Sequence, residues 1–183
     1  GASWLLKAAE QGDVAGQRLI AGMYQSGLGV PQDGTASVLW SKRAAEQGDV
    51  ESQARLGELF YQGKLVKQDL NQAATWYLLA AENGLARAQS NIGLMYRTGQ
   101  GVPRSQERAV SWFRRAADQG VSEAQYNLGR AYEIGRGVTQ DYTAAAEWYK
   151  KAADQGDADA EFAIGLLFER GLGVAKDLTV AFN

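Results

Sequence analysis

Residues 124–156 read AQYNLGRAYEIGRGVTQDYTAAAEWYKKAADQG, and this stretch carries the pattern of two amphipathic helices joined by a turn. In its first half, apolar residues recur at spacings of three and four on one helix face: Ala124, Leu128, Ala131 and Tyr132. The Gly-Arg-Gly-Val sequence at 135–138 follows, and its glycines stop the helix and let the chain turn. A second helix is predicted from about 141 to 155, with an inner face made of Ala145, Trp148, Tyr149 and Ala152.

The same pattern recurs along the whole chain with a period of 36 residues. Tryptophan marks the period, and an Ala-Ala pair and a glycine follow each one: Trp4, Trp40, Trp76, Trp112 and Trp148. A fixed period of roughly 20–50 residues is the mark of a solenoid, in which each unit buries its apolar face only against its neighbours. We therefore predict an all-α solenoid with no β-sheet, and we place the tryptophans on the face that packs against the neighbouring helix.

Turn and capping residues repeat in the same register. Gly-x-Gly-Val separates the two helices of a unit at 27–30, 99–102, 135–138 and 171–174, whereas 63–66 lacks the second glycine. A short polar side chain then stands where the next helix begins and can cap its exposed N–H groups: Asp33, Asp69, Ser105, Asp141 and Asp177. The first helices of three units have an aspartate in the same role: Asp13, Asp49 and Asp157.

Composition argues against several functions. The chain has no cysteine and no histidine, which removes thiolate metal sites, the usual proton shuttle and the commonest transition-metal ligand. The 19 basic and 21 acidic residues give a net charge of -2, so no general attraction to nucleic acid is expected. Apolar runs such as 163–168 are far shorter than the roughly 20 residues that cross a bilayer. We predict no cofactor, no metal, no membrane insertion and no catalysis.

The repeat resembles a known family. Its pattern is read most clearly in this order: Ala124-Gln125, Leu128-Gly129, Tyr132, Gly135-Arg136-Gly137-Val138, Asp141, Ala145, Trp148-Tyr149, Ala152-Ala153 and Gln155-Gly156. This order resembles the Sel1-like repeat, a relative of the tetratricopeptide repeat, and the resemblance covers essentially the whole chain. It implies a right-handed α-solenoid that serves as a scaffold for protein complexes, often in bacterial envelope, secretion or virulence settings, and hence a periplasmic or secreted location. Ala21 departs from the family pattern, because it replaces the helix-packing glycine of the other units.

The register predicts that residues 1–183 form a single solenoid of about five repeats, cut from a longer array. The chain opens inside a second helix and closes as another begins, and it shows no polar capping unit. In the final repeat, no complete second helix follows to cover the apolar residues of the first helix: Phe162, Ile164, Leu167 and Phe168. We expect end-to-end self-association through such uncapped repeats.

Positions that differ between units carry the functional information, because repeated positions are explained by the shared architecture. By the resemblance, the first helices line a concave groove, and the candidate binding residues there are Arg55, Tyr61, Arg87, Asn91, Arg97, Tyr126, Asn127, Arg130, Glu133 and Phe162. Asn91 and Asn127 occupy the same place in adjacent units, and each amide could bind peptide backbone or bond the neighbouring helix. The arginines could bind carboxylates of a partner or serve solubility alone.

These features favour a non-catalytic protein–protein interaction scaffold that binds a peptide or a protein surface in its concave groove. The alternative is a carbohydrate- or peptidoglycan-binding module of a bacterial cell-envelope complex. That alternative requires the rings of Tyr61, Tyr126 and Phe162 to face the groove rather than the core.

Overall fold

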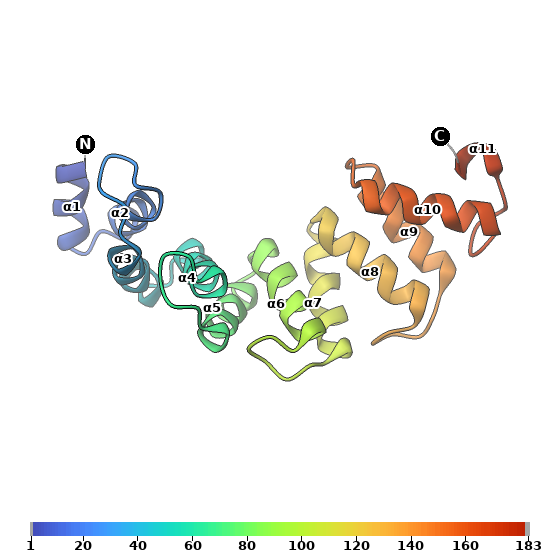
Figure 1. The fold of residues 1–183 in the computed structure, drawn as a ribbon, viewed down its shortest axis with the longest axis horizontal. Helices are drawn as coiled ribbons and strands as arrows, with labels where there is room; N and C mark the ends of the chain where they lie inside the picture. The colour runs from blue at the N-terminus through green and yellow to red at the C-terminus, as the bar shows by residue number, and fades with distance from the viewer. Residues whose placement is uncertain (1, 182–183) are drawn as a thin grey trace. The chain divides into compact units, whose positions relative to one another are not determined.

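The computed structural model describes residues 2–181, and within them the chain forms eleven helices and no β-strand (Figure 1). The helices are α1 (Ala2–Glu10), α2 (Val14–Ser26), α3 (Gly34–Glu46), α4 (Val50–Gln62), α5 (Leu70–Glu82), α6 (Ala86–Thr98), α7 (Gln106–Asp118), α8 (Ser122–Ile134), α9 (Tyr142–Ala153), α10 (Ala158–Arg170) and α11 (Leu178–Ala181). The prediction of an all-α chain built from paired helices is therefore confirmed.

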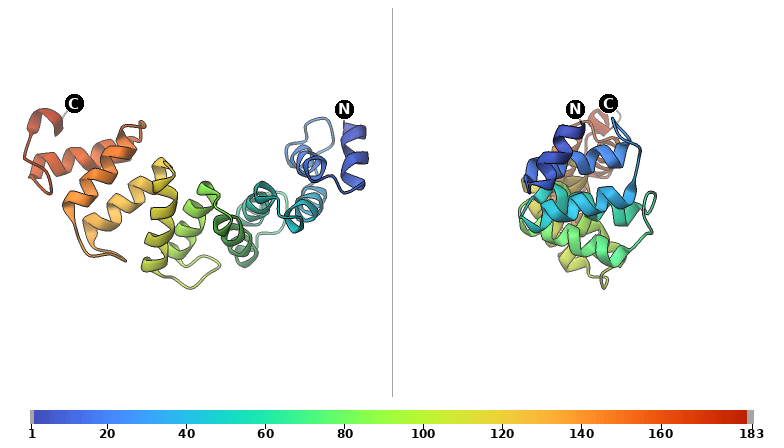
Figure 2. Two further views of the ribbon diagram at one scale, coloured as in Figure 1. Left: turned by 180° about the vertical axis from the view of Figure 1, so that it is seen from behind. Right: turned by 90° about the vertical axis from the view of Figure 1, so that its left-hand side faces the viewer.

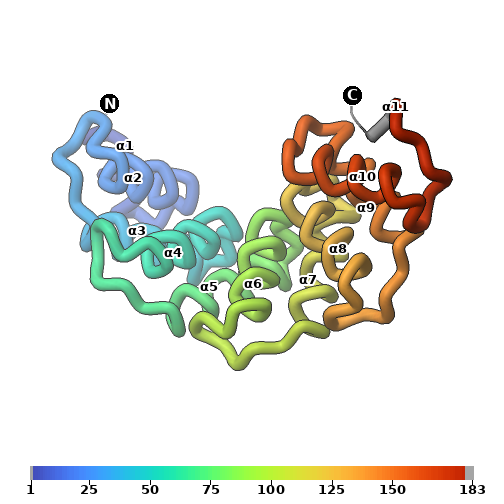
Figure 3. The backbone as a smooth tube through the Cα atoms, turned by 45° about the vertical axis from the view of Figure 1, so that its right-hand side comes forward, coloured from blue at the N-terminus to red at the C-terminus, as the bar shows by residue number. Residues whose placement is uncertain are grey.

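The helices divide into two compact units. Residues 2–88 with 100–102, which we call the N-terminal unit, hold α1 to α5 and the first residues of α6. Residues 89–99 with 103–181, the C-terminal unit, hold the rest of α6 and α7 to α11. Within each unit the principal packing joins helices adjacent in sequence, such as α2 with α3 and α8 with α9 (Figures 2 and 3). Such local packing is what a fixed repeat period predicts.

The predicted helix caps are present at the starts of α2, α3, α4, α5, α7, α9 and α10. In each, a side-chain oxygen accepts a hydrogen bond from the backbone N–H three residues later: Asp13, Asp33, Asp49, Asp69, Ser105, Asp141 and Asp157. The distances run from 2.6 Å at Asp13 to 3.2 Å at Ser105. These bonds satisfy donors that a helix leaves open at its first turn.

The Gly-x-Gly turns have a steric reason as well as a conformational one. Gly137 has a φ of 76°, and a Cβ added there would lie 2.4 Å from the carbonyl oxygen of Gln106. The chain then returns to the end of the preceding helix, where the Asp141 N–H donates to the Tyr132 carbonyl at 3.0 Å. Glycine is therefore required both for its positive φ and for this close approach.

The expected packing role of the tryptophans needs correction. Trp40 is buried, but Trp76, Trp112 and Trp148 are only half-buried and Trp4 is 76% exposed. Arg115 lies over the outer face of Trp112, 4.6 Å from the ring centroid.

The buried aromatic anchor of α5, α7 and α9 is the residue after the tryptophan: Tyr77, Phe113 and Tyr149. One residue further along a helix turns the side chain by about 100°, and this turn directs the anchor ring toward the preceding first helix. The ring there meets a glycine, at Gly57, Gly93 or Gly129. A Cβ added to Gly129 would lie 2.7 Å from the Tyr149 ring, which explains the glycine of the repeat.

The departure at Ala21 has a matching departure in the next helix. Ser41 in α3 occupies the place that Tyr77 has in α5, 36 residues later. Ala21 and Ser41 are both fully buried, and Trp40 packs with Ala21 in this part of the core. Because serine is far smaller than tyrosine, the methyl group of Ala21 fits at the place where the other repeats require glycine.

Buried glutamines connect successive helices within the repeats. Gln125 is 5% exposed, and its side chain donates to the Ala117 carbonyl at 3.2 Å. It also accepts a hydrogen bond from Gln155 at 2.7 Å. Equivalent pairs occur between Gln17 and Gln47, Gln53 and Asn83, and Gln89 and Gln119. These polar residues are buried because they have hydrogen-bond partners, and they are part of the shared architecture.

The apolar residues of α10 are covered to different extents. Leu167 was expected to be uncovered, but it is 1% exposed and belongs to a core cluster with Tyr149 and Ala160. Phe162, on the other hand, is 70% exposed. End-to-end self-association therefore stays a prediction, with Phe162 as the apolar side chain of α10 that is available for it.

Candidate functional site

A pocket of about 280 Å³ lies among α6, α7 and α8 in the C-terminal unit. Four of its lining residues are arginines: Arg97, Arg104, Arg130 and Arg136. Its apolar wall is formed by Ala109, Val110, Phe113, Ala131 and Ile134, and Gln106 and Asn127 complete the lining. No carboxylate is among the lining residues. We call this site the arginine pocket.

Arg97 is held in place by the residues around it. Its Nη1 donates a hydrogen bond to Oδ1 of Asn127, and its guanidinium lies 5.8 Å from the centroid of the Phe113 ring. Asn127 is 6% exposed, and its Nδ2 donates to the Glu123 carbonyl at 2.8 Å. Asn127 therefore uses its acceptor on Arg97 and its donor on its own helix, and it positions the guanidinium.

The arginine pocket is electropositive because four arginines and no carboxylate line it. Burial, and then the positive charge of Arg130, lower the pKa of Arg97. A guanidinium nevertheless stays charged at neutral pH. Within residues 2–181, neither Arg97 nor Arg130 forms an ion pair with a carboxylate. The pocket can therefore offer both charges to an anionic group from outside the chain.

Arg104 is free to line the pocket because another residue, Gln106, makes the hydrogen bond that closes the turn before α7. In other repeats a glutamine stands in its place and donates to the carbonyl seven residues earlier, as Gln68 does to Tyr61 at 2.8 Å. Gln32 and Gln140 make the same contact, at 2.8 and 2.7 Å. In the repeat that contains Arg104, the Gln106 side chain donates instead to the Arg97 carbonyl at 3.1 Å. The turn is thus closed without Arg104.

The sequence did not single out Arg104 or Arg136 as candidates, because both lie in turns. The sequence signal for Arg104 is that it replaces the glutamine found at the same place in three other repeats: Gln32, Gln68 and Gln140. Arg136 occupies the variable position of Gly-x-Gly, where Gln100 stands in the preceding repeat. A comparison restricted to the first helices could not reveal either residue.

Two other candidates of the C-terminal unit serve packing. The Tyr126 ring lies against that of Tyr149, with centroids 5.6 Å apart. Glu133 accepts a hydrogen bond from the Tyr149 hydroxyl at 2.6 Å. Burial, and then this hydrogen bond, raise the pKa of Tyr149.

Asn91 and Phe162 lie outside the lining of the arginine pocket. Asn91 is half-buried, and its side chain makes no hydrogen bond within the part of the chain that the structure describes. Phe162 is exposed on α10 and, like Asn91, has surface available for a partner.

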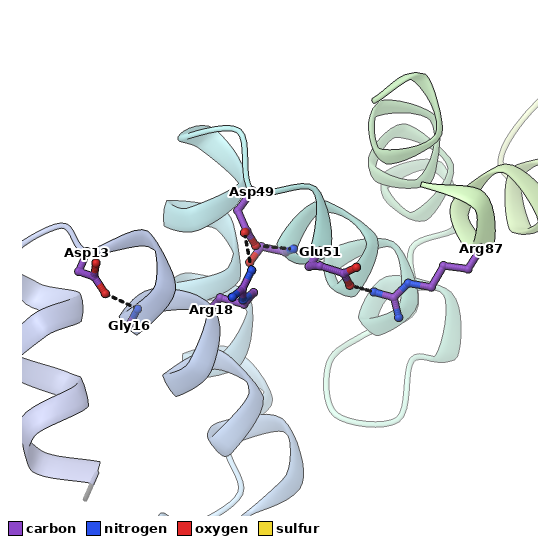
Figure 4. A network of polar contacts seen from close by, with 7 residues as sticks. Asp13, Gly16, Arg18, Asp49, Glu51 and Arg87 are labelled. Carbon is purple, nitrogen blue, oxygen red and sulfur yellow. Dashed lines mark hydrogen bonds and ion pairs between the residues drawn. The ribbon is translucent and has the colours of Figure 1, made fainter. Parts of the chain in front are cut away.

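Of the three candidates in the N-terminal unit, Arg87 and Tyr61 have partners within that unit, whereas the buried Nη1 of Arg55 has no hydrogen-bond partner among the described residues. Arg87 forms an ion pair with Glu51, and the neighbouring Arg18 pairs with Asp49 at 3.1 Å (Figure 4). Arg55 is half-buried, and burial, followed by the charge of Arg87, lowers its pKa. The Tyr61 hydroxyl donates to Gln100 at 3.2 Å.

The N-terminal unit has a pocket of its own, of about 390 Å³, and its lining mixes charges of both signs. Arg18 and Arg55 lie beside Glu51 there, with Leu19 and Met23 among the apolar lining residues. We call it the mixed-charge pocket.

Among the described residues, no group of three or more aspartates and glutamates is placed to hold a metal ion. None of the helices in that part of the chain is long and apolar enough to cross a membrane.

The paired helices and the repeated buried contacts define a helical repeat protein. The family model for the Sel1 repeat matches residues 1–13, 14–49, 50–85, 86–121, 122–157 and 158–183, so the chain belongs to the Sel1 repeat family. Members of this family are generally non-catalytic helical repeat proteins, and Sel1 repeats typically bind proteins. No curated protein sequence matches the chain.

Solved structures show the same fold. A protective antigen of uropathogenic Escherichia coli, described as displaying an SLR fold, is 40% identical and superposes with a TM-score of 0.95 over 99% of this chain. This chain spans only 39% of that antigen. A Sel1 repeat protein from Oxalobacter formigenes is 32% identical, with a TM-score of 0.86 over 93% of this chain and 68% of the other. Helicobacter pylori cysteine rich protein B, at 20% identity and a TM-score of 0.53 over 66% of this chain and 91% of its own, shares the fold.

Proposed function

We propose that this chain is a non-catalytic scaffold that binds an acidic segment of a protein partner in the arginine pocket. The observation that carries the proposal is a pocket with four arginines and no carboxylate in its lining. Guanidinium groups form paired hydrogen bonds with carboxylates, and arginine is enriched among the residues that dominate protein interfaces.

The chemistry of the lining also supports binding over catalysis. Apart from the arginines, the lining holds two amide side chains and apolar groups only. None of these can act as a nucleophile or exchange a proton near neutral pH. An arginine pocket can therefore hold and orient an anion, but it has no group that would transform it.

The two asparagines have different roles in this proposal. Asn127 positions Arg97, because both ends of its amide are already used inside the unit. Asn91 contacts the backbone of the bound segment, since its side chain has no partner among the described residues. The equivalence of the two positions in sequence thus does not extend to their function.

The geometry favours a protein partner over a glycan. A glycan site would need free aromatic faces, yet Tyr126 packs on Tyr149. Tyr61 lies edge-on to Tyr77, with centroids 6.5 Å apart. Phe162 is 70% exposed but lies on α10, outside the arginine pocket, so the three rings do not form one aromatic surface.

The test is a titration of the chain with fluorescein-labelled acidic, neutral and basic peptides of equal length, followed by anisotropy. We expect the acidic peptide alone to bind, and the double substitution Arg97→Ala with Arg130→Ala to weaken it at least about tenfold. Arg18→Ala removes an arginine from the mixed-charge pocket and is the matched control, with unchanged affinity. Equal binding by the double variant and the unaltered chain would remove the arginine pocket from the interface.

A further inference from the structure

We infer that the arginine pocket recognises one particular kind of acidic segment, in which an apolar side chain enters the pocket and an acidic residue on each side contacts the arginines. This inference rests on the proposed function and specifies the ligand of the same site. Three properties of the pocket lead to it: its volume, its apolar wall and the placement of its four charges.

The volume limits what can enter. Small-molecule sites usually measure about 300–1,000 Å³, and the arginine pocket, at about 280 Å³, lies just below that range. It is therefore large enough to take an aliphatic side chain of a partner. A pocket of this kind suits an anchor residue that a partner inserts from its surface.

The wall of the pocket is apolar. Phe113 is 2% exposed and Val110 is 8% exposed, whereas Ile134 is 44% exposed at the end of α8. An aliphatic anchor would contact these three side chains and cover the open side of Ile134. A carboxylate inserted against the same wall would lose its hydration over the apolar part of its surface. The apolar side chain of the ligand therefore belongs inside, and the acidic groups belong at the rim.

The arginines come from four different places. Arg97 lies on α6 and Arg130 on α8, while Arg104 lies in the turn before α7 and Arg136 in the turn after α8. Arg97 is half-buried, and the other three are exposed. One carboxylate can pair with one guanidinium fork, so a ligand with a single acidic group would leave most of this charge without a partner. Two acidic groups, one near the turn of Arg104 and one near the turn of Arg136, neutralise more of the positive charge.

The spacing of the motif follows from chain geometry. In an extended segment, alternate residues share one side, and each residue advances the chain by about 3.3 Å. Acidic residues two positions before and two positions after the apolar anchor then point the same way as the anchor, about 7 Å from it on either side. The motif is therefore acidic, any residue, aliphatic, any residue, acidic.

Three labelled peptides test the motif against the full chain by anisotropy. The first is Gly-Gly-Asp-Ser-Leu-Ser-Glu-Gly-Gly, the second has serine in place of leucine, and the third has glutamine in place of glutamate. We expect the first peptide to bind about tenfold more tightly than either of the others.

Variants assign the two preferences to the two parts of the pocket. Ile134→Ser changes an exposed part of the wall and should remove the preference for leucine while leaving that for the second acid. Arg104→Gln with Arg136→Gln should do the reverse. Arg18→Gln, in the mixed-charge pocket, is the control and should change neither.

Equal affinities for the three peptides, still lost in the Arg97→Ala and Arg130→Ala variant, would overturn the motif and leave the proposed function in place. Absence of binding to every acidic peptide by a folded chain would overturn both. Displacement of the first peptide by single-stranded polyuridylate at a lower concentration of negative charge would also overturn the inference, because the pocket would then prefer phosphate groups to a peptide.

Discussion

The N-terminal and C-terminal units use their arginines in different ways. In the N-terminal unit, Arg18 and Arg87 each form an ion pair with a carboxylate, that of Asp49 and that of Glu51. In the C-terminal unit, Arg97 and Arg130 line a pocket without one. Glu58 and Arg130 occupy the same place in their repeats, 72 residues apart, yet they carry opposite charges. The repeat architecture therefore does not determine the charge at this place, and the difference supports the proposal that the C-terminal unit binds the partner.

The largest expected effect concerns the tryptophans of the two units. Trp112→Ala should lower the free energy of unfolding by about 2 kcal/mol, which is less than the roughly 3–5 kcal/mol of a fully buried ring, because Trp112 is half-buried. Trp4→Ala should change it by less than about 0.5 kcal/mol, since the ring is 76% exposed. Urea denaturation of both variants measures the difference, and equal midpoints would contradict this account of the packing.

The second comparison uses the glycine that faces the aromatic anchor. Gly129→Ala should destabilise the C-terminal unit by roughly 1–2 kcal/mol, because the overlap of the added methyl group with the Tyr149 ring outweighs the gain of about 1 kcal/mol in helix propensity. Ala21→Gly, at the equivalent place in the N-terminal unit, should cost about 1 kcal/mol from helix propensity. The double change Gly129→Ala with Tyr149→Ser should recover part of the steric cost in a double-mutant cycle. A stabilising effect of Gly129→Ala alone would refute the packing argument.

Asn127 and Arg55 occupy equivalent places, and their loss should have different consequences for binding. Asn127→Ala should weaken the acidic peptide by about tenfold, because Arg97 loses the acceptor that holds it. Arg55→Ala changes the mixed-charge pocket and should leave that affinity unchanged. Anisotropy titrations of the two variants, with circular dichroism to verify folding, provide the measurement. An unchanged affinity in Asn127→Ala would show that Asn127 does not position Arg97 for binding.

The smallest expected effect is a difference in the sign of the stability change between two arginine substitutions. Arg87→Gln removes an exposed ion pair and should lower stability by about 0–1 kcal/mol. Arg130→Gln instead relieves the repulsion that acts on Arg97, so stability should stay the same or rise slightly. The two thermal midpoints, compared at low ionic strength where such interactions are least screened, test this. A clear loss of stability in Arg130→Gln would indicate a partner for this arginine within the chain.

Much of the fold could be predicted from the sequence, because local chemistry determines it. Caps such as Asp141 and turn glycines such as Gly137 act within a few residues, and each repeats in register. The choice between Trp148 and Tyr149 as the buried anchor could not be made from one helix, since both lie near the apolar face. It depends on where Gly129 leaves space across the helix pair.

The candidate site could be predicted only in part. Arg97 and Arg130 are candidates from the sequence because they lie on first helices at positions that differ between repeats. The structure places both in one pocket. Arg104 and Arg136 lie in turns, and their approach to the pocket depends on how the turns fold back on α7 and α8. The hydrogen bonding of Asn127, which Asn91 does not share, was also beyond sequence reasoning, because it depends on Arg97 reaching the Asn127 amide.

The most direct test of the central claim is a pair of charge reversals at the equivalent places of the two units. Arg130→Glu places a carboxylate in the lining of the arginine pocket, whereas Glu58→Arg makes the opposite change in the N-terminal unit. We predict that Arg130→Glu weakens the acidic peptide at least about tenfold and that Glu58→Arg leaves its affinity within about twofold. A change of similar size and opposite sign in Glu58→Arg, that is, about tenfold tighter binding, would mean that net charge, rather than the arginine pocket, governs binding.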